Sequence, residues 1–105
     1  MITKKPIIVF VVTVVFSVDA GVFGEELIGV TQSKTKAFEL LDNYDAVKAY
    51  KDMFFEGTLV NESKVYKDFD ADETGNMYYS ETMYMHGDED ATGVIVKTIY
   101  KKELV

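Results

Sequence analysis

The chain of 105 residues has 11 lysines, no arginine and 18 acidic residues, which gives a formal net charge of −7. This balance argues against direct nucleic-acid binding, which needs cations to neutralise phosphate and usually arginine to read it. Cysteine is absent, which excludes disulfides, thiolate zinc sites and cysteine nucleophiles. The length and the 48% apolar content predict a single domain over residues 1–105.

The first apolar segment, Ile7 to Val18, predicts a strand with two apolar faces. Lys4 and Lys5 precede it and Val18-Asp19-Ala20 resembles a signal-peptidase site, so a secretory signal is the alternative. The valine, isoleucine and phenylalanine side chains favour the strand, and the segment is shorter than the roughly 20 residues that cross a bilayer. We therefore expect a cytoplasmic protein with no membrane contact, and keep secretion as the alternative.

A hairpin partner and a helical region follow this strand. Asp19, Gly21 and Gly24 predict a turn, and Glu25 to Thr31 predicts the second strand. Ser33 can cap a helix that begins at Lys34. The helix has an apolar stripe at Ala37, Leu40, Tyr44, Val47 and Phe54.

The helical region has one internal break point and one expected end. Asn43 and Asp45 allow a break into two shorter helices, with Asp45 as the second cap, and Gly57 suits a C-terminal stop. Beyond Gly57 the pattern predicts extended segments separated by turns at 70–76 and 87–93. The predicted strands are Thr58 to Asn61, Lys64 to Phe69, Met77 to His86 and Val94 to Tyr100.

Together these elements predict an α+β fold. We expect an antiparallel sheet of four to five strands, with a mixed sheet as the alternative, and one amphipathic helix or a broken helix pair packed on one face. Helices on one face leave the second apolar face of the first strand without cover. Either the C-terminal strands fold over that face, or a second copy covers it in a homodimer, which we expect.

Acidic side chains gather between Asp68 and Asp90, a stretch with eight acids and no lysine. Such a surface suits a basic protein partner, and a solvated face is the alternative. The candidate partner-binding residues are Asp68, Asp70, Asp72, Glu73, Glu81, Asp88, Glu89 and Asp90.

Residues 70–81 resemble the EF-hand calcium loop. Acids stand at the first and third positions, glycine at the sixth and glutamate at the twelfth, and calcium needs six to eight oxygen ligands. The resemblance implies a calcium site as the cofactor alternative. A β-hairpin with an acidic turn is the interpretation we favour, because the residues after the loop are strand formers. The implied ligands are Asp70, Asp72, Thr74, the backbone carbonyl of Asn76, and Glu81.

No catalytic motif is present in the sequence. His86 is the one histidine, no nucleophile motif surrounds a serine, and no glycine-rich phosphate loop follows a strand. We therefore expect a non-enzymatic protein with no cofactor other than calcium.

The order of elements over residues 7–55 resembles small uncharacterised accessory proteins encoded by bacteriophages. The resemblance rests on the strand ending at Gly29-Val30, the Thr31-Gln-Ser33-Lys cap and the helix that follows. It implies an acidic protein that binds and inhibits or regulates a host defence or nucleic-acid-handling protein, in the cytoplasm of the host cell. A calcium-binding module and a self-associating structural or assembly protein are the alternatives.

Overall fold

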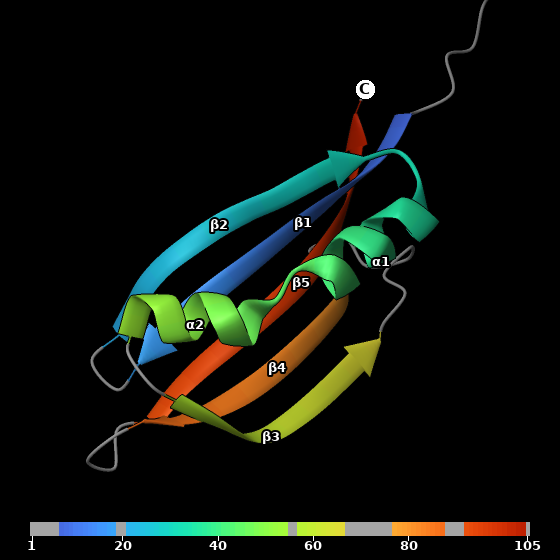
Figure 1. Ribbon diagram of the computed structural model, residues 1–105. Coiled ribbons are helices and arrows are strands. Elements are labelled where there is room, and N and C mark those ends of the chain that lie inside the picture. Colours follow the sequence, from blue (N-terminus) through green and yellow to red (C-terminus); the bar gives the residue numbers. More distant parts are fainter. Residues whose placement is uncertain (1–6, 19–20, 55–56, 67–76, 88–91, 105) are drawn as a thin grey trace, which may run out of the picture.

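A five-stranded antiparallel sheet with two helices forms the fold (Figure 1). The computed structural model describes residues 7–18, 21–54, 57–66, 77–87 and 92–104. The α+β class and the antiparallel sheet are confirmed, and most of the chain is strand. In chain order the elements are β1 (Ile7–Val18), β2 (Gly21–Thr31), α1 (Lys34–Asn43), α2 (Ala46–Phe54), β3 (Gly57–Tyr66), β4 (Met77–Gly87) and β5 (Thr92–Leu104).

The first and last strands pair with each other inside the sheet. The strand order is β2-β1-β5-β4-β3, so β5 is central and β2 and β3 are the edges. β1 pairs with β5 along its whole length, from Ile7 opposite Leu104 to Val18 opposite Gly93. This placement explains the apolar character of β1, because a strand with neighbours on both sides is buried in the sheet.

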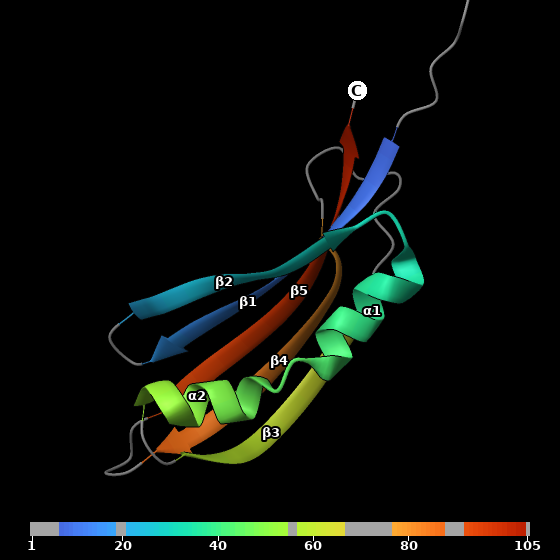
Figure 2. The ribbon, with the colours of Figure 1, turned by 45° about the horizontal axis from the view of Figure 1, so that its top comes forward.

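Both helices lie on the same face of the sheet (Figures 1 and 2). Alternate side chains of β1, at Phe10, Val12, Val14 and Phe16, are buried under them. The core forms two clusters along the strands, one under each helix. Under α1 lie Phe10, Val12, Ala37, Leu41, Tyr78, Tyr79 and Ile99. Under α2 lie Val14, Phe16, Ala46, Tyr50, Met83, Met85 and Ile95.

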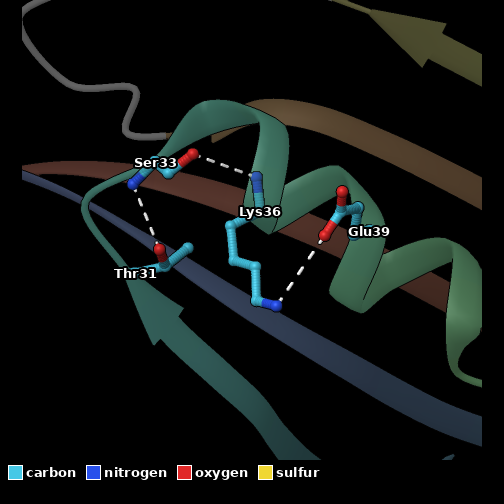
Figure 3. Close-up of polar contacts among 4 residues, drawn as sticks. All are labelled: Thr31, Ser33, Lys36 and Glu39. Atoms are coloured by element: carbon cyan, nitrogen blue, oxygen red, sulfur yellow. Dashed lines mark hydrogen bonds and ion pairs between the residues drawn. The ribbon is translucent and has the colours of Figure 1, made fainter.

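Side-chain caps determine where the helices begin. The Ser33 Oγ accepts a hydrogen bond of 3.2 Å from the Lys36 amide, and the Ser33 amide donates to the Thr31 Oγ1 at 3.1 Å (Figure 3). An exposed ion pair of 3.8 Å between Lys36 and Glu39 follows in the next turn. This cap is the one that the sequence predicts.

The helical region consists of two helices, which is the broken-pair alternative, and not of one continuous helix. Tyr44 has extended backbone angles (φ −82°, ψ 114°) and ends α1. Asp45 then caps α2, because its Oδ1 accepts a hydrogen bond of 3.0 Å from the Lys48 amide. In α1 the fully buried leucine is Leu41, whereas Leu40 is half-buried.

The strand bounds differ from the prediction at three places. β2 begins at Gly21, so two of the expected turn glycines lie within the strand, next to a register shift between Phe16 and Ser17. The two strands predicted between 58 and 69 form one strand, β3, with a register shift between Leu59 and Asn61. Gly57 begins this strand and does not end a helix. Neither described helix has the length and apolarity needed to cross a membrane.

Candidate functional site

The face of the sheet opposite the helices is open and carries apolar and small polar side chains. These side chains alternate with the core side chains of the same strands, so the pairing register identifies them. The small polar members are Thr13, Ser17, Thr58, Asn61, Ser63, Ser80, Thr82 and Thr98. On β1 and β5 the apolar members are half-buried valines and a tyrosine, and on the other strands they are exposed. The apolar members of this open face are Val9, Val11, Val15, Leu27, Val30, Val65, Tyr84, Val94, Val96 and Tyr100.

Charged groups are rare on the open face. Among the side chains that the structure describes there, only Glu25, His86 and Lys102 are acidic or basic, although 28% of the chain is charged. Leu27 is 65% exposed and Val30 is 55% exposed. Exposed apolar side chains on a surface with few charges are typical of an interaction site.

Two threonines occupy the middle of the open face, opposite each other on β1 and β5. Thr13 and Thr98 are 7% and 4% exposed. The Thr13 Oγ1 is the one buried side-chain oxygen or nitrogen in the described residues without a hydrogen-bond partner.

A second candidate site lies on the helix side, where α1 gives way to α2. A polar cleft of about 530 Å³ opens between residues 42–47 and strands β3 to β5. Its floor is one row of paired residues across the sheet: Lys64 opposite Glu81, and Glu81 opposite Lys97. The row falls between the two apolar clusters, because Glu81 separates Tyr79 from Met83 and Lys97 separates Ile95 from Ile99.

Glu81 is buried in the cleft and held by two donors. Its Oε1 accepts a hydrogen bond of 2.6 Å from the Tyr79 hydroxyl and lies 3.5 Å from the Lys64 Nζ. Burial, and then the hydrogen bond to Glu81, raise the pKa of the Tyr79 phenol above its ordinary value. The charge of Glu81 raises the pKa of the Lys64 ammonium. Lys64 also lies 3.7 Å from the carboxylate of Glu62 at the exposed side of the cleft.

Lys97 is 5% exposed and lines the cleft. Its ammonium has no ion pair or hydrogen bond with any residue of the described ranges. Glu81 is its direct cross-strand neighbour but is engaged on the other side, toward Lys64 and Tyr79. The Lys97 ammonium is not among the fully buried atoms without a partner, so it opens on the cleft.

A further polar contact stabilises the helix break beside the cleft. The Tyr44 hydroxyl donates a hydrogen bond of 2.5 Å to Glu26 on β2. Burial, followed by this bond, raises the pKa of Tyr44 to about 12. The residue that ends α1 is thereby tied to the sheet.

One of the predicted site residues lies within the described residues. Of the eight acids, Glu81 lies within the described chain, where its carboxylate is buried under the helices and not on an exposed acidic surface. Asp68, Asp70, Asp72, Glu73, Asp88, Glu89 and Asp90 lie outside the described residues, as do Thr74 and Asn76. Protein binding by the acidic stretch therefore stays a prediction.

Residues 77–81 of the segment that resembles a calcium loop belong to strand β4. β3 and β4 pair antiparallel, as the hairpin interpretation predicts, whereas an EF-hand loop continues into a helix. Within the described ranges no group of three or more His, Asp or Glu residues could hold a metal ion. Calcium binding by residues 70–76 lies outside those ranges and stays a prediction.

Sequence reasoning missed Lys97, Lys64 and Tyr79. A signal for Lys97 is present in the alternation of Ile95, Lys97 and Ile99, which assigns a lysine to the inward side of an apolar strand. No comparable local signal identifies Lys64, because its role depends on the pairing of β3 with β4.

Comparison with known proteins gives no match: no family model, curated protein or solved structure is similar to this chain. The bacteriophage resemblance therefore stays a prediction.

Proposed function

We propose that this protein acts by binding and not by catalysis, and that its open face pairs with the open face of a second copy. The proposal rests on the open face of the sheet, on which the described side chains are apolar or small and polar and only Glu25, His86 and Lys102 are acidic or basic. The self-associating assembly protein is thus the function that we favour among the alternatives.

The area of the open face suits a stable dimer. Five strands spaced about 4.8 Å apart, with about ten residues each at about 3.3 Å per residue, present roughly 800 Å². A standard protein–protein interface buries about 800 Å² on each partner. Two identical twisted sheets also have the same curvature, so they can pack face to face at about −30°.

Charge supports a second copy as the occupant. Two chains of net charge −7 repel each other at long range, so they associate best through a surface that has few charges of its own. A basic partner would instead be attracted to acidic surface, and Glu25 is the one acid among the described residues of the open face.

The test compares lysine substitutions on the two sides of the molecule. Leu27 and Tyr84 are exposed on the open face, and Met53 is similarly exposed on α2. We expect the wild type to be a dimer by analytical ultracentrifugation, the double variant Leu27→Lys/Tyr84→Lys to be a monomer, and the matched control Met53→Lys to remain a dimer.

The dependence of dimerisation on salt concentration is an independent test of the same interface. Added salt screens the repulsion between two acidic chains, so the dimer dissociation constant should fall as ionic strength rises. A wild type that stays monomeric up to about 1 mM at high salt would refute the proposal. So would a dimer that Met53→Lys disrupts and the open-face substitutions do not.

A further inference from the structure

The lysine in the polar cleft makes no ion pair or hydrogen bond within the described residues. Lys97 lies on the inward side of the central strand β5, between Ile95 and Ile99, and 95% of its surface is covered. Its ammonium is not among the fully buried side-chain atoms without a partner, so this end of the side chain reaches the space of the cleft. A lysine with a covered stem and an ammonium that opens on a cleft can contact a molecule bound there.

The cleft gives this ammonium access to a small molecule. Its volume of about 530 Å³ lies within the range of small-ligand sites, which is about 300–1,000 Å³. The helix break at Tyr44 and Asp45 forms one wall, and both residues are fixed there by hydrogen bonds to Glu26 and to the Lys48 amide. The wall is therefore preformed and does not depend on a ligand.

Two carboxylates, those of Asp42 and Glu62, lie at the rim of the cleft. Asp42 is exposed at the end of α1 and, within the described part of the chain, makes no ion pair. Its charge reaches into the site, since it contributes to the raised pKa of both Lys64 and Tyr79. Glu62 adds a second rim carboxylate, which Lys64 partly neutralises at 3.7 Å.

These charges select the ligand. The Lys97 ammonium needs an anionic acceptor, which a carboxylate supplies as a charge-assisted hydrogen bond. The rim acids repel polyanions such as nucleotides and attract a cation. We infer that the polar cleft binds a small zwitterion of the amino-acid class, with its carboxylate at Lys97 and its ammonium between Asp42 and Glu62. This inference is independent of the dimer, because the cleft lies on the helix side.

The experiment is an NMR titration of the full chain with glycine, γ-aminobutyrate and L-glutamine, each to about 10 mM. Acetate and ethylammonium serve as probes with only one of the two charges. At least one zwitterion should saturate the amide shifts of residues 42–47, 81 and 97, and should bind at least about tenfold more tightly than either probe.

Two variants test the roles of the charges. Lys97→Met should weaken zwitterion binding at least about tenfold. Asp42→Asn, at an exposed position, should weaken zwitterion binding severalfold, and it provides the test if Lys97→Met does not fold. The matched controls Lys48→Met and Asp52→Asn change exposed charges on α2 and should leave affinity unchanged. The inference is overturned if no zwitterion saturates, if acetate binds as tightly as the zwitterions, or if both cleft variants bind normally.

Discussion

Replacing Tyr79 with phenylalanine tests how the buried carboxylate of Glu81 is held. The substitution removes one hydroxyl and retains a ring that is 8% exposed and packs edge-on against Phe38 with a centroid distance of 5.0 Å. The lost bond is a 2.6 Å contact to a charged group. Bonds of this kind contribute about 1.5–3 kcal/mol, and each kcal/mol corresponds to about 4–8 °C in the melting temperature of a small domain.

The assay is urea unfolding followed by circular dichroism, at one fixed protein concentration because dimerisation would add to the apparent stability. We expect Tyr79→Phe to lower the free energy of unfolding by about 2 kcal/mol. The control Asp52→Asn, at an exposed position on α2 away from the open face and the cleft, should change it by less than about 0.5 kcal/mol.

A double-mutant cycle with Glu81→Gln assigns the loss to the pair. The two substitutions together should cost less than the sum of the single losses, by more than about 1 kcal/mol. If the cycle gives additive losses, or if Tyr79→Phe is as stable as the wild type, the reasoning that Tyr79 stabilises the buried charge is wrong.

Three further predictions concern packing, capping and pH. A Cβ added at Gly93 would lie 2.6 Å from the Tyr50 ring, whereas a Cβ added at Gly24 meets nothing within 4 Å. Gly93→Ala should therefore lower the free energy of unfolding by about 1–3 kcal/mol more than Gly24→Ala, as measured by thermal unfolding. Ser33→Ala removes the cap of α1 and should lower stability by about 1 kcal/mol in urea. Because the pKa of Tyr79 is raised in the fold, its contribution to stability is complete below about pH 10 and falls as the unfolded chain loses the phenol proton above that pH. Urea midpoints between about pH 9 and about pH 11 should therefore fall less steeply for Tyr79→Phe than for the wild type.

The local features of the fold could be predicted from the sequence. The two apolar faces of β1 indicate that it lies inside the sheet and that one of its faces needs further cover, because side-chain direction in a strand alternates regardless of its partners. The caps at Ser33 and Asp45 follow equally local rules, since a side-chain oxygen bonds an amide three residues later.

The pairing of strands and the polar cleft could not be predicted. The proximity of Lys64, Glu81 and Lys97 depends on β3, β4 and β5 lying side by side in one register. The sequence predicts that Glu81 belongs to an exposed acidic stretch, because runs of charged residues are normally solvated. Its burial depends on Tyr79 and Lys64, which meet it only after the sheet forms.

The pairing of β1 with β5 has a consequence for folding kinetics. β1 gains its second neighbour only after β5 has been synthesised, since the ladder runs from Val18 opposite Gly93 to Ile7 opposite Leu104. Until then the most apolar strand exposes an unpaired edge, which favours aggregation. The pairing of β1 with β5 also closes a long loop, which contains β2, both helices, β3 and β4, and closing a long loop slows folding. A shortened chain that ends before β5 would lack its central strand, and we expect it to aggregate during synthesis.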